Sequence, residues 1–244
     1  MNEINLVMPM AGEGSRFAKV GLEMPKPLIN INGKPFFYWA SQSVIKYCNV
    51  EKIIFVILER HVMEYGLDSV IRGYYPKSII KTIPKVLPGA VYSAMEGVKE
   101  IDNDSPVIIN DCDHMFFCPG LNLINNTLMG GEAGILSFKS DSPNYSYIKF
   151  DSNGKIVGTI EKKVVSNSAI CGAYVFNNKK VFLQYAEKYN KNCPYNESYI
   201  SGIYNELVED GCTVYEFPLK WHVEFGTPEE YDEAKKSDYF KGID

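Results

Sequence analysis

Residues 6–17, Leu-Val-Met-Pro-Met-Ala-Gly-Glu-Gly-Ser-Arg-Phe, are followed at residues 25–28 by Pro-Lys-Pro-Leu. The apolar start of the first stretch predicts a buried strand, which ends at a short loop with two glycines. Consecutive backbone N–H groups in such a loop form a concave anion site, and Arg16 and Lys26 add charge-assisted contacts. We therefore predict a polyphosphate site at the carboxyl end of the first strand, with a nucleoside triphosphate as its ligand. The predicted nucleotide contacts of this loop are Met10, Ala11, Gly12, Glu13, Gly14, Ser15 and Arg16, and the predicted catalytic residues are Arg16 and Lys26.

Two better-known phosphate-binding patterns do not occur in this chain. A Walker loop needs a Gly, four residues and then Gly-Lys-Ser/Thr, and no such string is present. The dinucleotide fingerprint needs a third glycine three positions after the second, where this chain has Phe17. In the alternative interpretation, Gly12 and Gly14 are ordinary turn residues and Lys26 is a solvated surface charge. Arg16 and the Pro-Lys-Pro segment together favour the functional interpretation.

Apolar runs alternate with helix-like patterns through the first half of the chain. Predicted strands cover residues 4–9, 53–58 and 106–109, and predicted helices cover residues 36–47, 60–72 and 89–99. Alternation of this kind implies right-handed βαβ units. The predicted fold class is therefore α/β, with a doubly wound, mostly parallel mixed sheet.

The second half of the chain changes character. Residues 147–150 and 155–160 flank a segment that ends in Asn153-Gly154, and an Asn-Gly pair is typical of the tight primed turns of β-hairpins. Further helices are predicted near residues 178–190 and 197–209. We expect one domain over residues 1–244, in which a nucleotide-binding half (1–115) is followed by an acceptor-binding half (116–244) with an inserted antiparallel β-rich lobe.

The composition excludes several classes of protein. A formal net charge of −5 and no basic stripe argue against a nucleic-acid partner. No apolar run approaches the length of a membrane span, and the N-terminus lacks the layout of a signal peptide. The cytoplasm is therefore the expected compartment, and a homodimer is only a default expectation. The six cysteines are predicted to be reduced thiols: Cys48, Cys112, Cys118, Cys171, Cys193 and Cys212.

A second chemical feature is the apolar run at residues 107–109, which leads directly into Asn110, Asp111 and, two residues on, Asp113. In an open α/β sheet, ligands lie outside the carboxyl ends of the strands, so these acids should lie near the phosphate loop. Mg²⁺ prefers one or two carboxylates with phosphate oxygens and waters. We prefer Asp113 as the metal ligand, with Asn110 and Asp111 supporting it at the nucleotide, although Asp111 is an open alternative. In the non-functional interpretation, Asp111 caps a turn and Asp113 faces solvent.

The pattern Ala-Gly-x-Gly-Ser-Arg-Phe followed by Pro-Lys-Pro-Leu resembles the signature of the nucleotidyltransferases that make NDP-sugars and related activated metabolites. The resemblance implies a Rossmann-like fold, and the matches run in family order from residue 8 to residue 230. It also implies roles for later residues. The nucleobase would meet Pro88, Gly89 and Ala90; the acceptor would meet Glu161, Lys162, Gly172 and Glu197; Mg²⁺ would be held by Asp113 and Glu224. Two positions depart from the family pattern: Lys163 replaces the usual Pro, and Glu224 replaces the more usual Asp.

The resemblance implies that an acceptor phosphate attacks the α-phosphorus of the nucleoside triphosphate and that pyrophosphate leaves. In this mechanism Arg16 and the loop backbone bind the leaving pyrophosphate, Lys26 lies at the α-phosphate, and Lys162 receives the acceptor. The chain is most similar to compact bacterial enzymes of surface-polysaccharide synthesis. This similarity implies CTP as the nucleotide and L-glutamine phosphate as the acceptor, in capsule synthesis.

Three alternatives stay open at this stage. The first is a sugar-1-phosphate cytidylyl-, uridylyl- or thymidylyltransferase. The second is phosphocholine as the acceptor, which would need a cage of aromatic side chains. The third is a catalytically silent nucleotide-binding regulatory protein, since fold does not fix function. Retention of two cations and two acids at the expected positions argues against the third.

Overall fold

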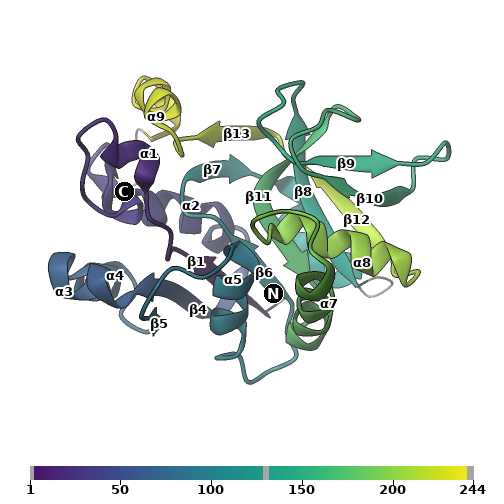
Figure 1. Ribbon diagram of the computed structural model, residues 1–244, viewed down its shortest axis with the longest axis horizontal. Coiled ribbons are helices and arrows are strands. Elements are labelled where there is room, and N and C mark those ends of the chain that lie inside the picture. The colour runs from purple at the N-terminus through teal and green to yellow at the C-terminus, as the bar shows by residue number, and fades with distance from the viewer. Residues whose placement is uncertain (1–2, 129–131, 241–244) are drawn as a thin grey trace.

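The structure is a computed structural model, and it describes residues 3–128 and 132–240. Four parallel strands form one half of its main sheet: β1 (Glu3–Pro9), β4 (Asn49–Leu58), β5 (Ile79–Ile83) and β6 (Val107–Asn110). They lie in the order β6-β1-β4-β5 (Figure 1). The chain thus runs outward from β1 to β5 and then crosses back to β6. This reversal leaves a crevice between the carboxyl ends of β1 and β6, where ligands of such sheets bind.

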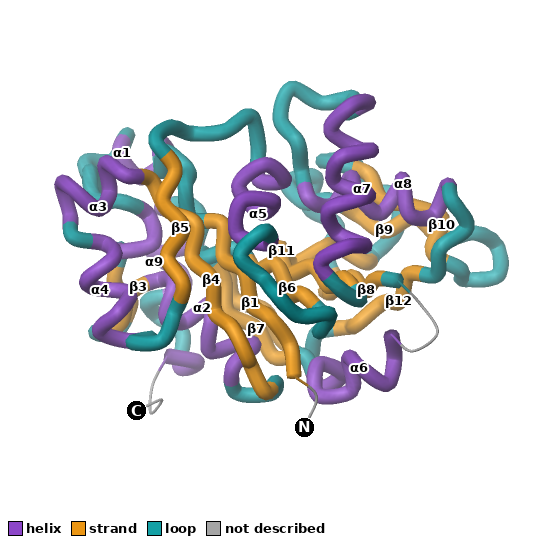
Figure 2. The backbone as a smooth tube through the Cα atoms, turned by 90° about the horizontal axis from the view of Figure 1, so that it is seen from below, coloured by secondary structure: helices purple, strands orange, loops and turns teal. Residues whose placement is uncertain are grey.

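Helices cover both faces of these strands because alternate residues of each strand point to opposite sides. Leu6 and Met8 pack in one cluster with α2 (Phe36–Ile45), whereas Val7 packs in another with α5 (Ala90–Val98). Figure 2 shows α5 on one side of the strands and α2 on the other. The doubly wound α/β sheet predicted from the sequence is therefore confirmed.

Antiparallel pairing extends the same sheet through the second half of the chain. Its strands are β8 (Ala133–Lys139), β9 (Tyr147–Phe150), β10 (Ile156–Ile160), β11 (Ser168–Phe176) and β12 (Val214–Pro218). β11 pairs antiparallel with β6 and with β8, and β9 pairs with β10 and β11. The helices α7 (Lys179–Asn192) and α8 (Ile203–Glu209) cover this part of the sheet (Figure 1). One continuous sheet thus joins the two predicted halves.

Two predicted helices differ in extent from the expectation. The helix expected over residues 60–72 is split into α3 (Glu59–Tyr65) and α4 (Leu67–Tyr74), because Gly66 adopts a left-handed conformation with φ of 61° and ends the first helix. The helix expected over 197–209 begins later, with a 3₁₀ turn at Ile200–Gly202 before α8.

The hairpin predicted over residues 147–160 is present as β9 and β10, but the predicted type of turn between them, a primed turn, is wrong. Asn153 does not adopt a positive φ, and Gly154 takes the left-handed conformation with φ of 79°. The reason is Asp151, whose carboxylate accepts the backbone N–H of Asn153 at 2.9 Å and so builds a wider loop. A local side-chain hydrogen bond overrides the preference of the Asn-Gly pair.

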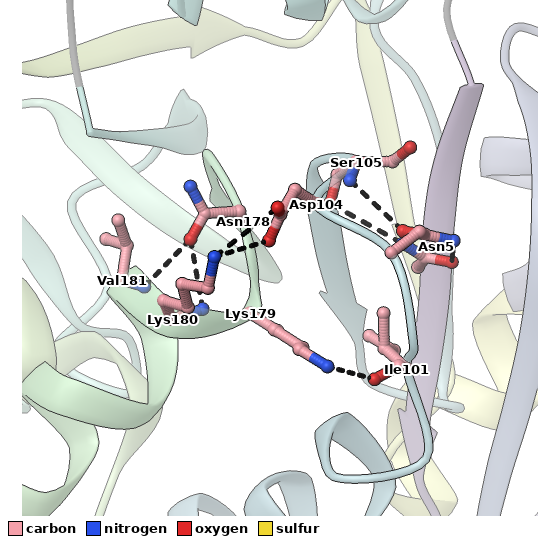
Figure 3. A network of polar contacts seen from close by, with 9 residues as sticks. Asn5, Ile101, Asp104, Ser105, Asn178, Lys179, Lys180 and Val181 are labelled. Carbon is pink, nitrogen blue, oxygen red and sulfur yellow. Dashed lines mark hydrogen bonds and ion pairs between the residues drawn. The ribbon is translucent and has the colours of Figure 1, made fainter.

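The segment at residues 101–105, which leads into β6, forms hydrogen bonds to strand β1 on one side and to helix α7 on the other (Figure 3). Asn5 Nδ2, fully buried in β1, donates to Asn103 Oδ1 at 2.7 Å. From the other side, Lys179 Nζ at the start of α7 donates to the carbonyl oxygen of Ile101 at 2.5 Å. These bonds hold α7 against the segment that enters β6.

Smaller elements lie around the edges of the main sheet (Figure 2). They are α1 (Ser15–Ala18), β2 (Asn30–Ile31), β3 (Lys34–Pro35), α6 (Ile124–Thr127) and α9 (Pro228–Ala234), with a two-stranded ribbon of β7 (His114–Phe117) and β13 (Trp221–Glu224). Of these, α6 lies near the N-terminus. α1 and α9 meet where the rings of Phe17 and Tyr231 form an edge contact (Figure 1). Among the helices of the described residues, none has the length and apolar character needed to cross a membrane. The six cysteines are free.

Candidate active site

A cavity of about 420 Å³ opens between the carboxyl end of β6 and the antiparallel half of the sheet. Its lining combines residues from the predicted nucleotide-binding half of the chain (1–115) and the predicted acceptor-binding half (116–244). Predicted residues among its walls are Arg16, Ala90, Asp111, Asp113, Glu161, Lys162, Gly172 and Glu224. The fold therefore brings cations and acids from positions 16 to 224 around one space.

Lys26 and Asp113 form the central contact of the site. Lys26 Nζ donates to Asp113 Oδ2 at 2.7 Å, although the two residues are 87 positions apart. Removal from water is the largest single influence on the pKa of Lys26 and lowers it. The charge and hydrogen bond of Asp113, with the charges of Cys112 and Asp111, together outweigh this and hold the net pKa above its usual range. Lys26 thus carries its charge at neutral pH. Both side chains keep part of their surface open, 29% and 22%, so a ligand can reach them.

The loop after β1 lies directly against Lys26. Gly14 adopts φ of 64°, and a Cβ placed there would lie 3.6 Å from the backbone nitrogen and the Cβ of Lys26. Arg16 follows in α1 and reaches the cavity lining. On the other side of the loop, Glu13 pairs with Arg60 at 2.5 Å and so faces α3. The loop therefore lies beside the Lys26–Asp113 pair at one end of the cavity.

Acidic side chains crowd the centre of the cavity. Burial raises the pKa of Asp111 to about 7, the charge of Asp113 adds to this rise, and Lys26 opposes it. Burial likewise raises the pKa of Glu224 to about 7, with further contributions from the charges of Glu230 and Asp113. A bound cation would stabilise the charged form of carboxylates whose pKa is raised in this way.

Two glycines let other segments approach these acids closely. A Cβ at Gly172, which has φ of 83°, would lie 2.7 Å from Asp111 Oδ2. A Cβ at Gly226 would lie 2.3 Å from Asp113 Oδ2. Next to it Thr227 caps α9, and its hydroxyl accepts the N–H of Glu230 in a capping box.

The ribbon of β7 and β13 carries both acids expected at the metal. Asp113 immediately precedes β7, Glu224 ends β13, and His114 is the register partner of Glu224. The backbone N–H of Phe225 donates to the carbonyl of Asp113 at 2.9 Å and extends the ladder. The hydroxyl of Tyr145, from the segment before β9, donates to the Glu224 carboxylate.

A chain of polar groups runs inward from the cavity: His114, which lines it, and Asn110 are buried, and His222 is half-buried. Asn110 Nδ2 donates to the carbonyl of Ala40 in α2 at 3.1 Å, and Asn110 Oδ1 lies 3.0 Å from His114 Nε2. His114 Nδ1 lies 3.1 Å from His222 Nε2. Burial lowers the pKa of His114 to about 4 and that of His222 well below its usual value, so both rings are neutral at pH 7.

The other end of the cavity is built around the pair Glu161 and Lys162. The Glu161 carboxylate accepts hydrogen bonds from the hydroxyls of Ser146 and, at 3.4 Å, Ser201. Lys162 adopts a left-handed conformation with φ of 52°, uncommon for a residue with a side chain. Its Nζ lies 5.4 Å from the centre of the Tyr199 ring. A negative and a positive group thus stand side by side at this end.

Some predicted residues do not line this cavity. Asn110 is fully buried with its amide directed to Ala40 and His114, so its side chain serves the interior. Glu197 is exposed and lies outside the lining. Pro88 and Gly89 form the wall behind Ala90, where the Pro88 carbonyl accepts the N–H of Ser198 at 3.2 Å. The predicted loop contributes its Arg16 side chain, whereas Met10, Ala11, Gly12, Glu13, Gly14 and Ser15 are not among the lining residues.

Several lining residues escaped the sequence analysis. They are Asn144, Tyr145, Ser146, Tyr174, Tyr199 and Ser201. Among them, Tyr174 is 8% exposed. The run Asn144-Tyr145-Ser146 before a predicted strand was the one local signal, since polar residues at strand ends often face ligands.

The donor set fits a hard cation. Within residues 3–128 and 132–240, no three His, Cys, Asp or Glu side chains converge to hold a metal ion by themselves. Mg²⁺ does not need such a cluster, because it takes one or two carboxylates and completes its shell with phosphate oxygens and waters. Burial raises the pKa of Asp111 and of Glu224 to about 7, and a divalent cation bound beside them would favour their charged forms. Asp111, Asp113 and Glu224 could therefore hold it.

Solved structures share this fold. A nucleoside-diphosphate-sugar pyrophosphorylase from Vibrio cholerae RC9 aligns with a TM-score of 0.82 at 22% identity, over 95% of this chain and 100% of that chain. An inositol-1-phosphate CTP transferase from T. maritima aligns with a TM-score of 0.72 at 19% identity, over 97% and 95%. A Bacillus anthracis protein assigned as a glucose-1-phosphate thymidylyltransferase aligns with a TM-score of 0.75 at 18% identity, over 96% and 94%.

Comparison of the sequence itself gives the family. No curated protein matches the chain. The family model described as nucleotidyl transferase matches residues 6–239, which include the predicted phosphate loop, Asp113, Glu224 and the Glu161-Lys162 pair. This chain belongs to the nucleotidyl transferase family.

Proposed function

We propose that this protein transfers a nucleoside monophosphate from a nucleoside triphosphate to a small phosphorylated acceptor and releases pyrophosphate. The observation that carries the proposal is the arrangement of charge in one cavity. Arg16 and Lys162 line the cavity together with the acids Asp111, Asp113, Glu161 and Glu224. Lys26 is not among the lining residues, but it bonds to Asp113 from the side of the loop after β1. Two phosphate-bearing substrates placed at these cations would meet beside the acids.

The reaction brings two anions together, so the protein must mainly neutralise and position them. In our proposal an oxygen of the acceptor phosphate attacks the α-phosphorus in line, and the bond to the pyrophosphate oxygen breaks. Lys26 stabilises the charge that develops at the α-phosphate, and Arg16 with the backbone of the loop binds the leaving pyrophosphate. Bound Mg²⁺ would supply Lewis-acid stabilisation of phosphate charge from Asp113 and Glu224, with Asp111 as the alternative ligand.

For the substrates we propose CTP and L-glutamine phosphate, in capsule or surface-polysaccharide precursor synthesis in the cytoplasm. The resemblance of the sequence motifs favours this pair. The lining of the cavity also supports it, because Tyr145, Tyr174 and Tyr199 all belong to it, as does the Glu161 carboxylate. Aromatic faces and a carboxylate suit an acceptor with an ammonium group, and L-glutamine phosphate carries one whereas a common sugar 1-phosphate does not. Phosphocholine would satisfy the same groups.

Pyrophosphate release tests the proposal. Purified protein with Mg²⁺ is supplied with CTP, UTP, dTTP, ATP or GTP, each against L-glutamine phosphate, phosphocholine and a panel of sugar 1-phosphates. We expect release with CTP and L-glutamine phosphate. If only a sugar 1-phosphate were turned over, the proposed acceptor would be wrong, but the proposed nucleotidyl transfer would stand. Nucleotide binding that needs no metal, together with no release from any pair, would contradict the transferase and favour a nucleotide sensor.

The acceptor assignment has its own variants. Tyr199→Phe keeps the aromatic ring, whereas Tyr199→Leu removes it, and Glu161→Gln removes the charge with little change of shape. We expect Tyr199→Leu and Glu161→Gln to raise the KM for the acceptor about tenfold, the scale of one cation–π contact or one charged partner. Tyr199→Phe should stay near the wild type. The KM for the nucleotide should not change in any of the three.

A further inference from the structure

We propose that the hydrogen-bonded chain Asn110–His114–His222 is a positioning device: it fixes the register of the β7–β13 ribbon and so holds Asp113 and Glu224 at the cavity. This inference rests on the proposed function only for the role of the two acids. The three side chains bring together β6, β7 and β13. Neither histidine has a role in the mechanism above.

The hydrogen bonds in this chain can run in one direction only. The carbonyl of Ala40 can only accept, so the amide nitrogen of Asn110 faces it and the amide oxygen faces His114. His114 Nε2 must then carry the proton and donate. In a neutral ring this leaves His114 Nδ1 as an acceptor, and His222 Nε2–H donates to it. Each donor in the series has one acceptor, which defines a single arrangement of the three side chains.

The ribbon needs additional contacts of this kind to keep its register, because a sheet of only two strands is marginally stable. β7 and β13 pair through four residues each, from Trp221 opposite Phe117 to Glu224 opposite His114. A slip of one residue would turn Glu224 to the other face of the ribbon, since side chains alternate. The contact between His114 and His222 is diagonal across the ladder, so it can form in the observed register and not in a slipped one.

The other end of the chain joins the ribbon to the rigid part of the fold. Asn110 is the last residue of β6 and bonds to α2 through Ala40. A second bond supports this connection, because the backbone N–H of Phe116 donates to the hydroxyl of Ser43 in α2 at 2.9 Å. The ribbon therefore takes its position from the central sheet and α2.

The test compares His222→Phe, which removes the N–H donor, with His222→Gln, whose amide nitrogen can replace Nε2. Gly97→Ala serves as the stability control, because it crowds Val7 and Val56 in the core behind α5, far from the ribbon in the fold. Two properties are measured on the full chain. They are Mn²⁺ binding by electron paramagnetic resonance with a non-hydrolysable CTP analogue, and amide hydrogen exchange of the ribbon without metal or nucleotide.

For His222→Phe we expect Mn²⁺ affinity to fall about tenfold, as when the outer partner of a metal ligand is lost. Exchange at the amides of Val223 and Phe225 should accelerate about tenfold, the scale of one lost hydrogen bond. His222→Gln should retain both properties within about threefold, and Gly97→Ala should bind Mn²⁺ as the wild type does.

Three results would overturn the inference. They are unchanged ribbon exchange in His222→Phe, equal losses in His222→Gln and His222→Phe, or the same loss of Mn²⁺ affinity in Gly97→Ala. Absence of Mn²⁺ binding in the wild type would instead count against the proposed metal site, and the exchange measurement would still decide whether the histidines pin the ribbon.

Discussion

Replacing Lys26 with Ala removes the cation that we place at the α-phosphate. At an effective dielectric constant of about 20, two unit charges about 4 Å apart interact by about 4 kcal/mol. The variant also leaves Asp113 without its partner at 2.7 Å, beside the second carboxylate of Asp111, so an approaching phosphate meets added repulsion. Loss of one donor to a developing charge costs about 2.7–4 kcal/mol in enzymes. We therefore expect kcat to fall at least about a hundredfold.

The fold of this variant should persist, because both partners are partly open to solvent, at 29% and 22% exposure. Pairs of this kind contribute at most about 1 kcal/mol to the free energy of unfolding. The assay is steady-state pyrophosphate release with saturating nucleotide, acceptor and Mg²⁺, alongside thermal unfolding. Lys19→Ala is the matched control, since Lys19 ends α1 nearby but is exposed and outside the cavity. Turnover of Lys26→Ala within about threefold of wild type would refute the electrostatic role given to Lys26.

Further predictions concern the backbone around the site and the core. Gly97→Ala should lower the free energy of unfolding by about 1–3 kcal/mol, because its Cβ would meet side chains of β1 and β4 at 2.6 and 2.8 Å. Gly73→Ala in α4, where the added Cβ meets nothing within 4 Å, should raise it by about 0.5–1 kcal/mol, and chemical denaturation measures both. Thr227→Ala should lower the free energy of unfolding by about 1 kcal/mol, because the cap of α9 is lost, and Thr227→Ser should retain most of that stability. Equal stability of the Thr227→Ala and Thr227→Ser variants would show that the cap is unimportant. Gly226→Ala should displace Asp113, since the Cβ would lie 2.3 Å from Oδ2, and should raise the half-saturating Mg²⁺ concentration about tenfold in the release assay; an unchanged value would separate Asp113 from the metal.

Much of the fold could be predicted from the sequence because its signals are local. The buried strands β1, β4 and β6 appear as short apolar runs, and α2 and α5 as helix-like patterns between them. Where the prediction failed, a nearby interaction was stronger than the pattern. Gly66 divides one predicted helix, and the Asp151 carboxylate replaces the turn that Asn153-Gly154 would otherwise favour.

In the candidate site, too, some features could be predicted from the sequence and others could not. The sequence by itself determined the candidates. The predicted phosphate loop, Lys26 and the acids at 111 and 113 follow from local patterns at strand ends or beside glycine and proline, and Glu224 follows from the family resemblance. Only the tertiary structure decided that Lys26 pairs with Asp113, that Asn110 bonds inward, and that three tyrosines line the cavity. The histidines at 114 and 222 are 108 positions apart and meet only because β13 pairs with β7. Contacts over such separations depend on the pairing of distant strands, which no local pattern of residues records.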